Sequence, residues 1–239
     1  MTLYAFAVPV LPGKAEKNRK LSEELSRRPE AKSIHEKAGI DRARVFQQNT
    51  PQGDFAIVVW ETDNGGRAMK SLMSANDDFS KRFRSELTDI HGPDVTDTSA
   101  MSTPELVAQW SDSDYDPKGN DYAFIVPIGR GKVDAFRSMI EDMYHGSQRA
   151  GFEETRRLLG VTRQTMFLLE TPMGAFALPV LEGPGASRVF GEQLKRDDHT
   201  FFAWWRDQLR NVTGRIPTNP PKVEKILDLM VKEPAVTRR

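Results

Sequence analysis

The sequence predicts an α+β protein in which one unit of strands and helices occurs twice along the chain. The segment YAFAVPVLPGK at residues 4–14 recurs as YAFIVPIGRGK at residues 122–132, with seven of eleven positions identical. A second pair of segments, residues 39–56 and 160–177, follows at nearly the same spacing and shares Arg, Phe, Thr-Pro, Gly and Phe-Ala at matched positions. Because the order is the same in both halves, we infer a tandem duplication with a period of about 120 residues.

The first half of each repeat is predicted to hold a strand, a pair of helices and a hairpin. Residues 4–10 are rich in β-forming side chains and favour a strand. Residues 14–38 are charged and helical, and Pro29 divides them because proline cannot continue an α-helix. Residues 42–49 and 54–61 form a hairpin, since the connecting Thr-Pro-Gln-Gly places proline second and glycine last in the turn.

The remainder of the first repeat is predicted to be helical. Helices are expected over residues 65–75 and 77–90. The second of them begins at Asp77 or Asp78, whose carboxylates can accept hydrogen bonds from free backbone N–H groups, and it ends at Gly92.

Each repeat closes with a short segment that follows its helices. In the first repeat, residues 105–110 favour a short strand. The second repeat is expected to have the same elements in the same order: strand 122–128, helix 132–159, strands 161–170 and 175–181, and helices 186–196 and 199–211. Residues 223–231 then correspond in order to 105–110, but their poor alternation leaves both strand and helix open.

The β-α-β-β-α-β order of each repeat is the ferredoxin-like order. In the strand at residues 54–61, alternate side chains point to opposite faces, and both sets are apolar. Both faces must then be covered, one by the repeat's own helices and the other by a second sheet, which the other repeat supplies. We therefore predict two tandem ferredoxin-like repeats, residues 1–110 and 121–239, that form an intramolecular dimeric α/β-barrel. An acidic linker at residues 111–120 joins them, and we expect a monomeric pseudo-dimer or a homodimer.

The composition excludes several classes of protein. The chain has no cysteine, which rules out disulfides, zinc–thiolate sites, iron–sulfur clusters and a cysteine nucleophile. Lys plus Arg and Asp plus Glu are 34 each, and this balance argues against a dedicated nucleic-acid binder. No apolar run reaches the roughly 18 residues that span a bilayer, and residues 1–12 lack the features of a signal peptide. We expect a cytoplasmic protein with no nucleic-acid or membrane partner.

Four segments carry a resemblance to a known family: YAFAVPVLPGK, TPQGDFAIVVWE, DDFSKRFRSELTDIHG and PELVAQW. They resemble an uncharacterised bacterial family of the dimeric α/β-barrel superfamily, whose single-repeat members pair as homodimers. The resemblance implies the fold and carries no catalytic residues. The wider superfamily includes cofactor-independent antibiotic-biosynthesis-type monooxygenases, EthD-like proteins, muconolactone isomerases and haem proteins such as chlorite dismutases, and the fold alone does not choose among them.

Histidines are the candidate acid–base groups. His145 lies where the second repeat carries a short insertion, and we take it as a candidate general base or haem ligand. His35 is the other candidate base, whereas His91 and His199 are expected to serve helix ends. Since no two histidines have the spacing of metal ligands, the sequence predicts neither a metal nor a cofactor.

Positions that differ between the repeats indicate a pocket in the first repeat. Gln47 and Gln48 stand where the second repeat has two leucines, and Trp60 stands where it has Leu181. Strand amides beside a tryptophan can supply the few polar groups of an apolar ligand pocket. The alternative is that the glutamines face solvent at a strand end. Gln47, Gln48 and Trp60 are our candidate substrate-binding residues.

Other conspicuous residues are predicted to be structural. Arg42 and Arg163 occupy equivalent strand starts, which favours a symmetric ion pair or a contact between sheets. The aromatic residues at 201–205 favour helix packing. Residues 129–132 favour a strand-to-helix turn, because they lack the spacing of a phosphate-binding loop.

Three functions are compatible with these observations. The first is a cofactor-independent, monooxygenase-like enzyme that acts on a small hydrophobic, cyclic molecule, with His145 or His35 as base. The second is a non-catalytic ligand-binding or stress-associated protein with the same pocket. The third is a haem protein with His145 as axial ligand.

Overall fold

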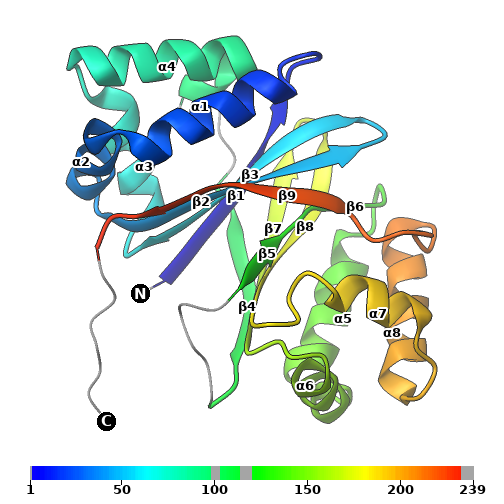
Figure 1. Ribbon diagram of the computed structural model, residues 1–239. Coiled ribbons are helices and arrows are strands. Elements are labelled where there is room, and N and C mark those ends of the chain that lie inside the picture. The colour runs from blue at the N-terminus through cyan, green and yellow to red at the C-terminus, as the bar shows by residue number, and fades with distance from the viewer. Residues whose placement is uncertain (1, 98–102, 114–119, 233–239) are drawn as a thin grey trace. The chain divides into compact units, whose positions relative to one another are not determined.

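The fold consists of two compact units. The computed structural model describes residues 2–97, 103–113 and 120–232 of the 239-residue chain. Met1–Thr103 and Lys222–Arg239 form unit 1, and Pro104–Pro221 forms unit 2. Each unit contains an antiparallel sheet packed against its own helices (Figure 1). The predicted α+β fold class is confirmed.

Unit 1 contains a four-stranded sheet with strand order β1-β3-β2-β9. Its strands are β1 (Thr2–Val10), β2 (Ile40–Thr50), β3 (Gly53–Thr62) and β9 (Lys222–Met230). Its helices are α1 (Ala15–Arg27), α2 (Pro29–Lys37), α3 (Gly65–Ser74), α4 (Asp78–His91) and the short 3₁₀ helix η1 (Pro93–Thr96).

Unit 2 contains a five-stranded sheet with order β4-β7-β8-β5, in which β6 also pairs with β8. Its strands are β4 (Glu105–Ser111), β5 (Asp121–Ala123), β6 (Val126–Ile128), β7 (Arg163–Thr171) and β8 (Gly174–Glu182). Its helices are α5 (Val133–Tyr144), α6 (Arg149–Leu158), α7 (Val189–Lys195) and α8 (Thr200–Thr213).

Local signals place several of these boundaries as expected. Pro29 is the first residue of α2, where its missing N–H costs no helical hydrogen bond. The carboxylate of Asp77 accepts the backbone N–H of Ser80 at 3.0 Å and caps α4. Gly92 ends α4 with φ +92°, a conformation that favours glycine.

Two elements of the second repeat differ from the prediction. The strand expected at residues 122–128 is divided into β5 and β6, which pair with two stretches of β8. Phe124 lies at the break opposite Pro179, which has no N–H to continue the ladder. The helix expected at residues 132–159 is divided into α5 and α6 by a turn at residues 145–148.

Each sheet is completed by the closing strand of the other repeat. Strand β9 pairs with β2 over eight partners, from Arg42 opposite Met230 to Asn49 opposite Lys222, and Figure 1 shows β9 in red beside β2. Strand β4 in turn pairs with β7. Of the two structures left open for residues 223–231, strand and helix, the chain therefore adopts the strand.

The compact units consequently do not follow the expected division at residues 1–110 and 121–239. That division treated each repeat as a self-contained sheet. The backbone hydrogen bonds of β4 and β9 are instead satisfied in the sheet of the opposite repeat, so each closing strand belongs to the other unit.

Both faces of the unit 1 sheet are buried, as the alternating apolar pattern of β3 predicts. One face carries Phe6, Ala43 and Trp60 and packs against the helices. On the other face, Ile57 and Val59 are both 0% exposed. In the part of the chain that the structure describes, no helix has the length and apolar character needed to cross a membrane.

Candidate functional site

A cavity of about 80 Å³ lies between the sheet of unit 1 and its helices. Its walls are apolar and include side chains from all four strands of the sheet and from α1, α2, α3 and α4, among them Phe6, Val58, Leu72 and Phe83. Five side chains with polar atoms interrupt this lining: Asn18, Ser22, His35, Trp60 and His91. An apolar cavity with a few polar groups is the usual form of a small-ligand site.

His35 is held in the cavity wall by helix α2. Its side chain is 4% exposed, and its Nδ1 lies 2.7 Å from the carbonyl oxygen of Ala31, one helical turn earlier. A carbonyl oxygen can only accept, so Nδ1 carries the proton and donates it. Burial lowers the pKa of His35, which keeps the ring neutral and leaves Nε2 as a proton acceptor.

His91 repeats this arrangement from the end of helix α4. Its side chain is 8% exposed, and its Nδ1 donates to the carbonyl oxygen of Pro9 at 2.8 Å. Burial also lowers the pKa of His91. The expected role as a charged partner of the helix end is therefore corrected: the ring is neutral and faces the cavity. The two imidazoles give this cavity two groups that can accept a proton.

The only sequence signal that His91 faces the cavity is its helical spacing from apolar residues. Phe83, Leu87 and His91 recur every four residues on α4, and all three line the cavity. A histidine that continues an apolar helix face is thereby marked as inward-pointing. Its position before Gly92 suggested a helix-end role, so the helix face that it shares with Phe83 and Leu87 was not considered.

Trp60 and Gln47 both contribute to the cavity, one directly and one through a neighbour. Trp60, on β3, stacks with Tyr4 at a centroid distance of 6.1 Å and meets Phe6 edge-on at 5.2 Å. The amide nitrogen of Asn18 donates to the side-chain oxygen of Gln47 at 3.0 Å, and both residues are buried. Gln47 therefore positions Asn18, which lines the cavity.

Gln48 and His145 do not lie at this cavity. Gln48 pairs with Phe55 on the face of β2 that points away from the helices. His145 follows the last residue of α5 in unit 2; its side chain is exposed and lines neither this cavity nor the one in unit 2. The insertion in the second repeat, which suggested a position near a cavity for His145, forms a turn at the surface.

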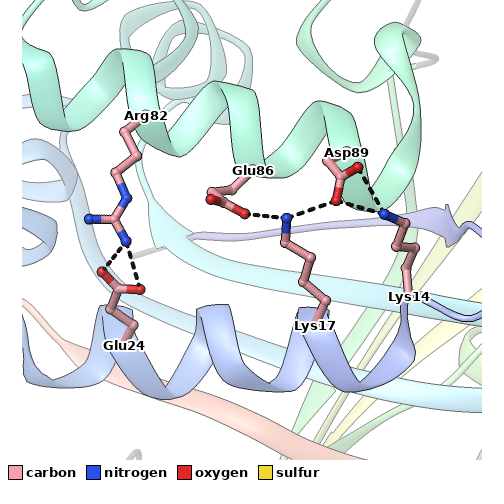
Figure 2. A network of polar contacts seen from close by, with 6 residues as sticks. All are labelled: Lys14, Lys17, Glu24, Arg82, Glu86 and Asp89. Atoms are coloured by element: carbon pink, nitrogen blue, oxygen red, sulfur yellow. Dashed lines mark hydrogen bonds and ion pairs between the residues drawn. The ribbon is translucent and has the colours of Figure 1, made fainter.

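A surface network of ion pairs joins α1 and α4, two of the helices that border the cavity (Figure 2). Lys14 and Lys17, at the start of α1, each place Nζ 2.8 Å from the carboxylate of Asp89 on α4. Lys17 also contacts Glu86 at 2.7 Å. At the other end of α1, Glu24 pairs with Arg82 at 2.9 Å. Two lysines beside Asp89 lower the pKa of its carboxyl to about 2.

The structural residues singled out in the sequence behave largely as expected. Arg42 forms ion pairs with Asp228 at 2.7 Å and with Glu61 at 3.7 Å, and Arg163 pairs with Glu182 at 3.4 Å. The ring of His199 accepts the backbone N–H of Phe201 at 3.0 Å and caps α8. Phe201, Phe202 and Trp205 are buried in unit 2.

A second cavity, of about 70 Å³, lies between the sheet and the helices of unit 2. Its polar side chains include Arg156, Gln164 and Gln193. Among the described residues of either unit, no group of three or more His, Asp or Glu side chains is arranged to hold a metal ion.

Comparisons with known proteins reveal similarity of fold. No protein-family model and no curated protein matches the sequence. A crystal structure from Fusobacterium nucleatum subsp. nucleatum ATCC 25586, described as a "Putative monooxygenase", aligns with 95% of this chain and 91% of its own, at a TM-score of 0.50 and 10% identity. An anthrone oxidase-like protein aligns over 93% of this chain and 89% of its own, at a TM-score of 0.52 and 14% identity.

Proposed function

We propose that the unit 1 cavity binds a small hydrophobic, cyclic molecule and oxygenates it without a cofactor. The observation that carries this proposal is the pair of buried, neutral imidazoles, His35 and His91, at one apolar cavity. Each ring has Nδ1 engaged by a carbonyl, so Nε2 can accept a proton. The names of the two structural neighbours agree with an oxidation and support the proposal at the level of fold only.

In this reaction the substrate supplies the electrons. Nε2 of His35 takes a proton from an activated CH₂ group of the substrate, and the electron pair stays on carbon as a carbanion. Dioxygen accepts these electrons and bonds to that carbon, and the resulting peroxide takes the proton back from the imidazolium. Loss of water then leaves a carbonyl. One O₂ is consumed and one H₂O is released for each CH₂ converted.

His91 is the alternative base, and the cavity favours a compact substrate. An engineered apolar cavity of about 150 Å³ binds benzene, whereas this one has about 80 Å³. A cyclic ligand thus requires side chains to move, and Met69 and Met73 in the lining are flexible enough to do so.

The experiment measures oxygen uptake by the purified full chain, without added cofactor, for a graded panel from 2-indanone to anthrone. These probes share an activated CH₂ group and differ in size. We expect uptake with at least one probe. General base catalysis contributes about 100-fold or more, so His35→Gln should reduce the rate by that factor. If His91→Gln does so instead, His91 is the base.

The matched control is His145→Gln, since this exposed histidine lies outside both cavities. It should leave the rate unchanged. Thermal stabilisation by the probes without any oxygen uptake would overturn the enzymatic proposal in favour of a non-catalytic binding protein. The haem alternative rested on His145 as axial ligand and loses that basis, because its side chain is exposed.

We also propose that the protein works in the cytoplasm, as a monomeric pseudo-dimer or as a homodimer. The support is the expectation from the sequence, and light scattering of the purified chain separates the two oligomeric states.

A further inference from the structure

Unit 2 contains a buried positive charge that has no carboxylate partner in the part of the unit that the structure describes. Arg156 projects from α6, is 2% exposed and lines the unit 2 cavity. Its Nε donates to the side-chain oxygen of Gln164 at 2.6 Å, and its guanidinium lies over the ring of Phe152 at 4.6 Å. Its Nη1 has no hydrogen-bond partner among the described residues. A buried charge of this kind is costly unless something pairs with it.

The guanidinium is charged at neutral pH despite its burial. Burial lowers the pKa of Arg156 to about 10, and the nearby Tyr144 hydroxyl does not offset this. The charge therefore cannot be removed by losing a proton near pH 7. Two aromatic rings and one amide oxygen are the neutral groups that stabilise it.

The other unsatisfied polar atoms nearby can also donate hydrogen bonds. The amide nitrogen of Gln193, which lines the same cavity, is buried and has no partner in the described structure. The hydroxyl of Tyr144 is fully buried near Arg156 and beside the side chain of Gln164, and among the described residues it forms no hydrogen bond of normal geometry. Unsatisfied hydrogen-bond donors around an apolar cavity favour a ligand that carries hydrogen-bond acceptors.

The corresponding place in unit 1 holds a different group. Arg156 lies four residues before Gly160, just as His35 lies four residues before Gly39. His35 projects from α2, which precedes β2, and Arg156 projects from α6, which precedes the corresponding strand β7; both line the cavity of their unit. Gln164, which accepts from Arg156, stands where unit 1 has Ala43. A neutral base in one cavity thus corresponds to a permanent cation in the other.

We propose that the unit 2 cavity binds a small apolar carboxylic acid as its carboxylate, held by Arg156 and Gln193. The guanidinium and the amide supply donors for the carboxylate oxygens. The apolar part of the acid lies against the remaining lining, which includes Met139, Met143 and Met166. The volume of about 70 Å³ suits a short aliphatic chain, and the methionines allow some widening.

The experiment uses the full chain with ¹³C-methyl methionine and titrates butyrate, hexanoate and benzoate. Saturable shifts of the cavity methionine methyls are expected with at least one carboxylate. The neutral analogues butanamide and 1-hexanol should bind at least tenfold more weakly, because they bring no charge to the guanidinium. Equal binding of acids and neutral analogues, or no saturable shift with any of the three acids, would refute the proposal.

Two variants test the role of the charge. Arg156→Gln should weaken carboxylate binding at least tenfold. The matched control is Arg157→Gln: Arg157 is the next residue but is exposed, pairs with Asp112 and Glu153, and should keep full affinity. Unchanged affinity in Arg156→Gln would place the carboxylate elsewhere and contradict the assignment.

A third variant separates binding from a structural role. Arg156→Met removes the unpaired charge and keeps an apolar side chain of similar length. In the absence of ligand its melting temperature should equal or exceed that of the parent, since an uncompensated buried charge is removed. A much lower melting temperature would show that Arg156 is retained for folding and would overturn the binding role.

Discussion

Burial decides the chemistry of the histidines more than their position in the sequence does. His35 and His91 are neutral because desolvation lowers their pKa, and a carbonyl oxygen fixes the tautomer of each ring. His145 has the same side chain, but it lies at a surface turn outside the cavities of both units. The environment of each ring, which is set by packing, therefore distinguishes His35 and His91 from His145.

The lowered pKa values predict how stability depends on pH. Between the native pKa and the ordinary value of 6.5, the unfolded chain binds more protons than the native chain. The free energy of unfolding should therefore have its full value above pH 6.5 and should decrease as the pH is lowered below 6.5. Each histidine contributes at most about 1.4 kcal/mol per pH unit.

Urea unfolding of the parent and of His35→Gln at pH 5.5, 6.5 and 7.5 checks this prediction. The variant should show the weaker pH dependence, while His145→Gln should match the parent. A parent whose stability rises on acidification through this range would contradict the buried, neutral state of the rings.

The Asn18–Gln47 pair predicts a second effect at this scale. Gln47→Leu leaves the buried amide of Asn18 without its acceptor, and an unsatisfied buried donor costs about 1–3 kcal/mol. Urea unfolding should show this loss. Adding Asn18→Leu should restore part of it, because replacing both partners removes the unsatisfied group. A double variant no more stable than Gln47→Leu would show that the hydrogen bond is not the cause.

At the scale of elements, short-range chemistry is the most predictable feature. Pro29 and Asp77 mark helix starts because each acts on its own backbone neighbours. The hairpin between β2 and β3 also determines which residues of the two strands lie on the same face of the sheet. Its two-residue turn sets Thr50 opposite Gly53 and, by alternation, Gln47 opposite Ala56. Gln47 therefore shares the face of Trp60, and Gln48 does not.

What escaped prediction at this scale depends on partners from distant segments. Pro179 interrupts the ladder only because β8 is the strand that β5 and β6 pair with. Three polar side chains that line the unit 2 cavity, Arg156, Gln164 and Gln193, come from α6, β7 and α7, which no local pattern connects. Arg156 was passed over because a lone arginine on a charged helix usually lies in solvent.

The α1–α4 ion pairs predict a change in helix dynamics. Asp89→Asn removes the carboxylate that Lys14 and Lys17 share (Figure 2). Exposed pairs contribute little to global stability, so the urea midpoint should change slightly. Amide hydrogen exchange in the first turns of α1 should become several-fold faster.

Salt and a second variant provide the controls for that measurement. In 1 M NaCl the parent and Asp89→Asn should exchange at similar rates, because salt screens exposed charges. Asp207→Asn removes an ion pair with Arg210 that lies within a single helix, and it should leave α1 unchanged. Equal exchange of α1 in parent and Asp89→Asn at low salt would show that the network does not hold the helix.

For the whole molecule, the exchange of β4 and β9 was beyond prediction from the sequence. The repeat indicated that two similar sheets exist, but apolar alternation marks a strand without naming its neighbour. A ladder within one repeat would have satisfied the same pattern. The structure assigns each closing strand to the sheet of the other repeat.

This exchange predicts that the halves of the chain depend on each other. A cut within residues 114–119 gives one fragment that lacks β9 and another that lacks β4. Neither should unfold cooperatively alone, and co-expression should yield a complex that co-purifies through a tag on one fragment. A single fragment that melts like the intact chain would disprove this dependence.

The pairing of β2 with β9 also has a consequence for how the protein is made. Arg42 and its partner Asp228 are 186 residues apart in the chain. During synthesis from the N-terminus, unit 1 acquires β1, β2 and β3 early, yet β2 stays an open edge until β9 leaves the ribosome. Open edges pair with other chains, so the newly made protein passes through an interval in which aggregation competes with completion of the sheet. Slower elongation over the second repeat prolongs that interval, and a chaperone that covers β2 protects it.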